Sequence, residues 1–392
     1  MRSRARRGDS AAPAPPAAAW ETRTGAARTA LAWLSATRPR SLTAAVAPFL
    51  VGSALGVSSE GGAANWAHAS LLLLAYLLIQ IGTNLVNDAC DFERGADRDD
   101  RVGPRRVTQS GVFAPRLVRR AGVACFLLAA VAMLPPIRAQ GRPLLLLLLS
   151  ACAAGYLYTG GPYPYGYRGG GDLAVIAMFG VVAVAGAARV HRVAPPFDDT
   201  AVPAVAAGVV DPSSSATPAP FLTDPATLTA GAQVGSLAAV LLAVNNLRDV
   251  DTDRRAGKRT LAVLLGEGFV RREIYALLFA PFLANAWWAR RFVLADARGE
   301  GGGEGGWTWA PAAAGGGGEG SSSSWCWAGR FGRVSMAAAL PTLVGPLALD
   351  VARAVARTPT PSPAFNGILA KAAAAHFSFG ALLAAGILLD SS

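Results

Sequence analysis

Residues 84–111 read Asn-Leu-Val-Asn-Asp-Ala-Cys-Asp-Phe-Glu-Arg-Gly-Ala-Asp-Arg-Asp-Asp-Arg-Val-Gly-Pro-Arg-Arg-Val-Thr-Gln-Ser-Gly, and they begin inside a long apolar run. Asn84, Asp88 and Asp91 follow the i, i+4, i+7 spacing that places side chains on one face of a helix. A charged Asp at the centre of a membrane helix costs about 2.5–3.5 kcal/mol on insertion scales. This polar stripe therefore needs a compensating partner.

A divalent cation would compensate these acids. Carboxylate and amide oxygens favour Mg²⁺, which binds one or two carboxylates together with substrate phosphates; Mn²⁺ is expected to substitute. Gly95 predicts the end of the helix, and another acid follows it. The candidate ligands in this segment are Asn87, Asp88, Asp91 and Asp97.

A second acidic segment, residues 245–261, also ends an apolar run. Asp249 and Asp253 stand at i, i+4, so one helix face presents both. Arg248 and Lys258 are close in sequence, and basic groups of this kind take phosphate oxygens. Either segment alone is also explained as a solvated, charge-paired loop. Together they favour a pair of metal sites around one diphosphate, where cations stabilise a departing diphosphate.

Composition indicates a membrane protein. The chain has 392 residues, of which 52% are hydrophobic and 16% charged, with mean hydropathy +0.36; soluble domains have about 25% charged residues. We expect an all-α, polytopic bundle of about nine transmembrane helices. The predicted spans are 42–58, 68–88, 121–137, 143–159, 172–190, 229–247, 271–293, 333–352 and 366–389.

The net charge of +11 comes almost entirely from arginine, and no nucleic-acid-binding module accompanies it. The arginines gather after the second and sixth predicted spans, whereas the loop after the first span has no Lys or Arg. The positive-inside rule therefore places both acidic segments on the cytoplasmic or stromal side and the C-terminus on the opposite side.

Four ranges describe the predicted organisation. Residues 1–30 are rich in Ala, Arg and Pro and fit either a transit peptide or a disordered basic tail. The membrane domain is expected over 36–390. Two low-complexity stretches, 194–228 and 296–329, are predicted to be flexible insertions because they have little apolar surface to bury.

A third segment, residues 156–173, joins the fourth and fifth predicted spans and is rich in Tyr and Gly. Tyr158 is a candidate to line the site, because aromatic faces attract cations. Arg168 is a candidate anion ligand. An interfacial aromatic belt explains the same pattern.

At these residues the chain resembles the UbiA superfamily of intramembrane prenyltransferases, and within it the branch that prenylates 1,4-dihydroxy-2-naphthoate. The matching stretches lie in 84–88, 95–97, 103–105, 109–111, 158–162, 171–173 and 246–261. The resemblance implies a nine-helix bundle around a cavity that the two acidic segments cap. It implies metal ligands at Asn87, Asp88, Asp91, Asp97, Asp249 and Asp253. It implies catalytic roles for Asp91, Asp249, Asp253 and Lys258. The substrate-binding residues that it implies are Asn87, Arg105, Tyr158, Arg168, Asp172, Asn246 and Arg248.

The implied reaction joins a prenyl diphosphate to the naphthoate ring with loss of CO₂, as a step of menaquinone or phylloquinone synthesis. The transit-like N-terminus favours a plastid membrane with the site facing the stroma, and hence a phytyl or long polyprenyl donor. Two alternatives stay open. The first is a homogentisate or 4-hydroxybenzoate prenyltransferase, and the second is a membrane transporter, because intramembrane acids also mark ion paths.

Overall fold

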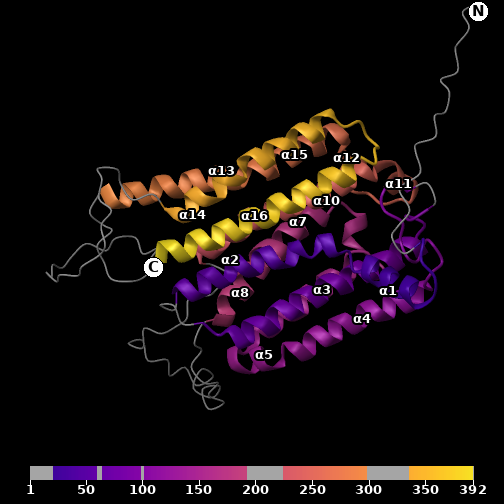
Figure 1. Cartoon of the computed structure of the whole chain (residues 1–392), viewed down its shortest axis with the longest axis horizontal. Helices are drawn as coiled ribbons and strands as arrows, with labels where there is room; N and C mark the ends of the chain where they lie inside the picture. The colour runs from indigo at the N-terminus through magenta and orange to yellow at the C-terminus, as the bar shows by residue number, and fades with distance from the viewer. Residues whose placement is uncertain (1–20, 60–63, 99–100, 192–223, 298–334, 392) are drawn as a thin grey trace, which may run out of the picture.

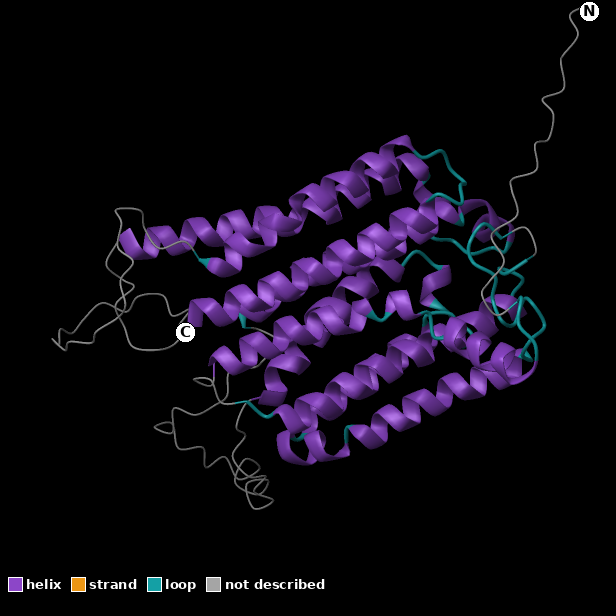
Figure 2. Cartoon of the chain, in the orientation of Figure 1, coloured by secondary structure: helices purple, strands orange, loops and turns teal. Residues whose placement is uncertain are grey.

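The computed structural model describes residues 21–59, 64–98, 101–191, 224–297 and 335–391, and within these ranges it contains helices and no strands (Figures 1 and 2). The longer helices lie side by side and form one bundle (Figure 1). The α-helices are α1 (Gly25–Ala36), α2 (Thr43–Ser59), α3 (Trp66–Glu93), α4 (Pro115–Ala132), α5 (Leu134–Gln140), α6 (Arg142–Leu157), α7 (Gly171–Val175), α8 (Ala183–His191), α10 (Pro225–Arg248), α11 (Val250–Arg255), α12 (Leu261–Leu265), α13 (Glu267–Ala297), α14 (Met336–Ala339), α15 (Gly345–Arg357) and α16 (Phe365–Ser391). The 3₁₀ and π segments are η1 (Pro39–Ser41), η2 (Tyr165–Tyr167), η3 (Ile176–Val182, a π-helix) and η4 (Leu340–Val344).

Helices lie where the apolar runs predicted spans, but the expected number of spans is not confirmed. In the described part of the chain, five helical segments are long and apolar enough to cross a membrane, or up to seven if each of two bent pairs counts as one span. Helix α6, with 16 residues, is a shorter apolar helix, and α13, with 31 residues, is not among these spans. The chain is therefore an integral, multi-pass membrane protein.

The boundaries of the predicted segments shift in three places. Residues 25–30, expected in a tail, begin α1, and residues 296–297, expected in an insertion, end α13. Residues 225–228, expected in a flexible loop, begin α10, where the Asp224 side chain caps the helix by accepting from the backbone N–H of Thr227 at 2.9 Å. Most of 1–30, 194–228 and 296–329 lies outside the described residues, so the predicted flexibility of these segments is untested.

Small residues bring the helices of the bundle close together. A Cβ atom on Gly180 of η3 would stand 2.3 Å from the carbonyl oxygen of Gly231 in α10. A Cβ on Gly52 of α2 would stand 2.2 Å from the carbonyl oxygen of Val184 in α8. Both contacts need a residue without a side chain, which is a common basis for helix packing in membranes.

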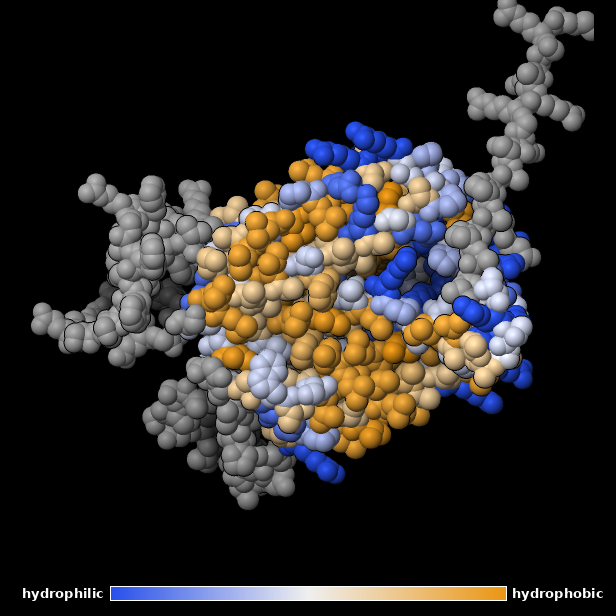
Figure 3. Space-filling model, viewed as in Figure 1, coloured by the Kyte–Doolittle hydropathy of each residue, from blue (hydrophilic) through white to orange (hydrophobic). Residues whose placement is uncertain are grey.

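The ends of the bundle differ in polarity. Apolar residues cover its middle, whereas hydrophilic residues gather at the end that holds α11 (Figure 3). Lys258 lies 3.6 Å from Asp91, and Arg101 lies 3.5 Å from Asp249, so the two acidic segments meet at this end, as predicted from loop order. The C-terminus lies at the opposite end (Figure 1). Which membrane side each end faces stays a prediction.

Candidate active site

A cavity of about 620 Å³ opens between the helices beneath the two acidic segments. Its mouth is polar, and its interior is apolar. The polar lining includes Asn87, Asp88, Asp91, Arg101, Arg105, Asn246, Arg248, Asp249, Asp253 and Lys258. The apolar lining includes Tyr76, Ile79, Leu147, Met178, Phe179, Val182, Leu241 and Leu242.

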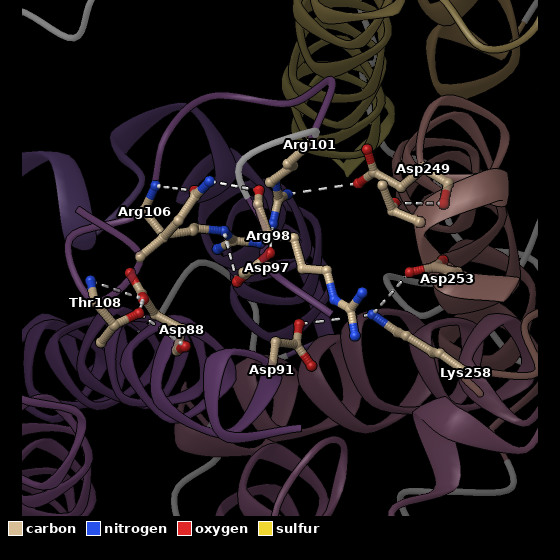
Figure 4. A network of polar contacts seen from close by, with 12 residues as sticks. Asp88, Asp91, Asp97, Arg98, Arg101, Arg106, Thr108, Asp249, Asp253 and Lys258 are labelled. Carbon is tan, nitrogen blue, oxygen red and sulfur yellow. Dashed lines mark hydrogen bonds and ion pairs between the residues drawn. The ribbon is translucent and has the colours of Figure 1, made fainter. Parts of the chain in front are cut away.

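The end of α3 positions the first acidic segment. Gly95 adopts a left-handed backbone (φ +73°), as the sequence predicted for a helix end, and the backbone N–H of Ala96 donates to the carbonyl of Asp91 at 2.8 Å. The chain then turns back over the helix. Asp97 consequently lies buried above the mouth, ion-paired with Arg101 and 3.5 Å from Arg106 (Figure 4).

The second acidic segment spans the junction between α10 and α11. Asp249 interrupts the helix, yet the backbone N–H of Asp253 donates to its carbonyl at 2.8 Å, so the i, i+4 relation predicted from sequence is kept. Gly257 then takes φ +71°, and the N–H of Lys258 donates to the carbonyl of Asp253 at 2.9 Å. This turn brings Lys258 back toward the acids.

Lys258 connects the two segments. Its Nζ lies 3.6 Å from Asp91 and 3.8 Å from Asp253, on opposite sides of the mouth (Figure 4). Burial would lower the pKa of Lys258, but Asp253 and Asp91 outweigh burial and raise it above its ordinary value. The side chain is therefore a fixed positive charge between two carboxylates.

Arg101 forms a second connection. It pairs with Asp97 from the first segment and reaches Asp249 of the second at 3.5 Å. Arg248 also binds Asp249, at 2.8 Å and 2.6 Å, and donates to Asn366 at 2.8 Å. Burial would raise the pKa of Asp249, but Arg248 and Arg101 outweigh it and lower that pKa to about 2. Asp249 is therefore ionised at neutral pH.

The segment between α6 and α7 donates hydrogen bonds to side chains of the first acidic segment. Tyr167 donates from its hydroxyl to Asp91 at 2.8 Å, and its ring centroid lies 5.4 Å from Nζ of Lys258. Thr159 donates to Asn87 at 2.7 Å. Tyr158 lines the cavity and packs edge-on against Tyr165, with ring centroids 5.4 Å apart. This segment thus orients the carboxylate of Asp91 and the amide of Asn87, both of which are proposed to bind metal.

The other candidates occupy different positions. Asp88 accepts from Thr108 and lies at the cavity wall. Arg105 lines the mouth and pairs with Glu21 at 3.5 Å. Arg168 and Asp172 are not part of the cavity lining: Arg168 stacks over the ring of Tyr163 at 4.7 Å, and Asp172 is buried in the first turn of α7. Their predicted binding roles remain predictions.

Sequence reasoning did not select several residues that the structure brings to the site, among them Arg38, Arg101, Arg106, Thr159 and Tyr167. Arg101 is one of eight arginines in its loop, and no local pattern distinguishes it from the rest. Thr159 and Tyr167 lie in the Tyr- and Gly-rich segment 156–173. That pattern is the sequence feature that could have pointed to them.

Comparison with known proteins identifies the family. A model of the UbiA prenyltransferase family matches residues 45–298. The chain belongs to this family. It is therefore a transferase, which sets aside the transporter alternative.

Two curated relatives in this family are named 1,4-dihydroxy-2-naphthoate octaprenyltransferase. The protein of Mycobacterium tuberculosis is 36% identical over 65% of this chain and 79% of its own length. The protein of Escherichia coli is 32% identical over 67% of this chain and 81% of its own length. Among solved structures, the apo structure of a UbiA homolog from Aeropyrum pernix K1 is 16% identical, covers 89% of this chain and 97% of its own, and has a TM-score of 0.53. That likeness supports the shared fold.

Proposed function

We propose that this UbiA-family enzyme transfers a prenyl group from a prenyl diphosphate to 1,4-dihydroxy-2-naphthoate with loss of CO₂. The observation that carries the proposal is the cavity, because a charged mouth with both acidic segments leads into an apolar interior. Such a cavity fits a substrate with a diphosphate head and a hydrocarbon tail. The names of the bacterial relatives support the naphthoate acceptor.

The acidic residues fit Mg²⁺, although they do not form a ready-made cage. Within the described ranges no group of three or more His, Cys, Asp or Glu side chains stands close enough to hold a metal. Each acid instead binds a cation or hydroxyl of the protein, as Asp91 binds Lys258 and Tyr167. All-oxygen donors with few carboxylates per ion are what Mg²⁺ uses when substrate phosphates complete its coordination. Asn87, Asp91, Asp249 and Asp253 would hold it, with Asp88 and Asp97 beside them, and Mn²⁺ would substitute.

When bound, the metal supplies positive charge to the diphosphate oxygens as the bond to the prenyl carbon breaks. The chain's own cations contribute to the same stabilisation. Lys258 and Arg248 are held at the mouth by Asp253 and Asp249, so their charges are in place before the leaving group develops.

The apolar interior protects the allylic cation. Phe179 and Leu241 line this region together with other hydrophobic side chains, which exclude the water that would otherwise capture the cation. The ring of Tyr158 lines the same cavity, where an aromatic face attracts positive charge. The new carbon–carbon bond then forms with the electron-rich acceptor ring, and the acceptor carboxylate leaves as CO₂.

The second candidate is a homogentisate or 4-hydroxybenzoate prenyltransferase, and the naphthoate names of the relatives disfavour it.

The product of the proposed naphthoate reaction would enter menaquinone or phylloquinone synthesis. The arginine-rich, acid-poor N-terminus supports a plastid membrane with the site facing the stroma, and a phytyl or long polyprenyl donor follows from that location.

The test is an assay of membranes that contain the full chain. Dihydroxynaphthoate, homogentisate and 4-hydroxybenzoate would each be offered with phytyl and solanesyl diphosphates, with Mg²⁺, Mn²⁺ or EDTA. We expect prenylated naphthoquinol and CO₂ from dihydroxynaphthoate alone, and no product with EDTA. Prenylation of another acceptor, or full activity without metal, would refute the corresponding part of the proposal.

Substitutions test the acids directly. Asp91→Ala, Asp249→Ala and Asp253→Ala should each lower turnover by about 10²–10³, the usual effect of one lost group that stabilises developing charge. Protein level in the membrane is the control. Turnover near the native value in Asp249→Ala would mean that the diphosphate binds elsewhere.

A further inference from the structure

The turn between α1 and α2 places a cation in the cavity wall. Arg38 adopts a left-handed backbone (φ 52°), the one described residue other than glycine that does so. A positive φ is uncommon outside glycine, and such strain persists where the surrounding structure holds it, often at functional sites. Here α3 holds the turn. Asn84 donates to the carbonyl of Thr37 and to the hydroxyl of Ser41, both at 2.9 Å.

Arg38 differs from its neighbours in having no ion pair among the described residues. Five other cations that line the cavity lie within 4.0 Å of a carboxylate oxygen: Arg101, Arg105, Arg106, Arg248 and Lys258. Arg40 also lines the cavity without an ion pair, but it is exposed. Arg38 is only partly exposed, and among the described residues its side chain has one hydrogen bond, a long one of 3.5 Å to the carbonyl of Asn84.

The acids nearest to Arg38 along α3 are already engaged. Thr108 donates to Asp88, whereas Lys258 and Tyr167 contact Asp91. Apart from the bond to Asn84, the guanidinium therefore keeps its donors for a ligand. An arginine fork matches a carboxylate in a planar, bidentate arrangement.

Arg38 contacts α3 before the acidic residues of that helix. Its guanidinium donates to the carbonyl of Asn84, which precedes Asp88 by four residues and Asp91 by seven. Lys258 and Arg101 pair with the acidic segments, whereas Arg38 has no such pair and lines a cavity that also has apolar side chains such as Ile79 and Val182. An aromatic ring with one carboxylate suits a free cation in such a lining.

We propose that Arg38 binds the carboxylate of the aromatic acid acceptor and so orients its ring toward the prenyl carbon. This inference rests on the proposed function, since it requires an acidic acceptor in the same cavity. It assigns acceptor recognition to the α1–α2 turn and leaves diphosphate recognition to the two acidic segments.

Separate Michaelis constants for the two substrates test this role. We expect Arg38→Gln to raise the KM for dihydroxynaphthoate about 10- to 100-fold, the usual worth of a hydrogen bond to a charged group, and to leave the KM for the prenyl diphosphate unchanged. Arg38→Lys, which keeps the charge, should recover part of the loss. The matched control is Arg28→Gln, on α1, exposed and not part of the cavity lining, for which both constants should stay within about twofold of the native values.

A neutral inhibitor provides the second arm. 1,4-Dihydroxynaphthalene has the same ring and hydroxyls without the carboxylate, so its inhibition constant should be the same for the native enzyme and Arg38→Gln. A raised KM for the diphosphate, or an unchanged KM for the acid, would overturn the inference. If Arg38→Gln does not accumulate in membranes, Arg38→Lys gives the same test. It should raise the KM for dihydroxynaphthoate by a smaller factor and leave the KM for the prenyl diphosphate unchanged. Native membranes that do not prenylate dihydroxynaphthoate would instead refute the proposed function.

Discussion

Lys258, like Arg101, connects the two acidic segments, and the chain has only one other lysine, Lys371. In Lys258→Gln, Asp91 and Asp253 would face each other and the diphosphate without the ammonium that now separates them. We expect turnover to fall by about 10²–10³, with partial recovery in Lys258→Arg. Initial rates at equal protein in membranes would measure this.

Lys371 offers a matched control for that change. It forms an exposed ion pair with Asp350 at 2.7 Å, and exposed pairs contribute little. Lys371→Gln should therefore leave turnover within about twofold of the native rate. Equal losses of turnover in Lys258→Gln and Lys371→Gln would mean that the charge of Lys258 stabilises the fold and does not act on the diphosphate.

Tyr167 acts through its hydroxyl on Asp91 and through its ring beneath Lys258. Tyr167→Phe removes the first contact and keeps the second. Because a hydrogen bond to a charged group is worth about 1.5–3 kcal/mol, we expect a loss in kcat of at least about tenfold. Tyr163→Phe, at a ring that is 70% exposed, is the control and should be silent. An unchanged kcat in Tyr167→Phe would show that Asp91 is held by Lys258 alone.

At the scale of the helices, the contact of η3 with α10 depends on the absence of a side chain at Gly180. In Gly180→Ala the new Cβ would stand 2.3 Å from the carbonyl oxygen of Gly231, so the backbones must separate. We expect a lower melting temperature in detergent and a loss of activity, since Met178 and Phe179 of the same segment line the cavity.

Gly268, in the first turn of α13, is the matched control for this substitution. Its added Cβ would meet no atom within 4 Å. Gly268→Ala should therefore be neutral or stabilising by up to about 1 kcal/mol, because alanine favours helix. Equal melting temperatures for the two variants would contradict the close approach of η3 and α10.

The helices also show how far sequence reasoning reaches in this protein. Apolar runs predicted where helices lie, because a membrane helix needs a continuous stretch of apolar residues whatever its neighbours are. The spacing of Asp249 and Asp253 likewise followed from local geometry. Loop conformation did not follow, because the approach of Arg101 to Asp249 joins residues 148 positions apart in the sequence.

The same distinction explains the differences at the margins of the site. Arg168 and Asp172 belong to a motif with the right chemistry, but their backbone directs one onto Tyr163 and buries the other in α7. Arg38 has no motif around it that marks it, because Asn84, 46 residues later, fixes its turn. Periodicity reports which residues share a helix face and is silent about contacts between distant segments.

At the scale of the whole molecule, the two ends of the bundle have separate tasks. The acidic segments and the cavity mouth occupy one end, whereas the end of α13 and the start of α14 lie at the other, near the C-terminus (Figure 1). There Asp390 of α16 accepts from the backbone N–H of Met336 at 2.7 Å and from the hydroxyl of Ser335 at 2.7 Å. These contacts tie α14 to α16 without any part of the Gly- and Ser-rich stretch between α13 and α14.

Deleting residues 297–324 from that stretch should therefore leave prenyl transfer within about twofold of the native rate, because the closure entropy of a connection changes only logarithmically with its length. The 27-residue α16 alone extends about 40 Å from the mouth end to this end, so the end of α13 and the start of α14, which flank the deletion, lie far from the acidic segments. Asp390→Ala is the comparison at the same end and should lower stability by about 1 kcal/mol by removing the cap. Initial rates and melting temperatures at equal protein would be measured for both. A collapse in rate for the deletion alone, with protein level unchanged, would show that this stretch shapes the cavity from the far end, and the separation of the two ends would then be wrong.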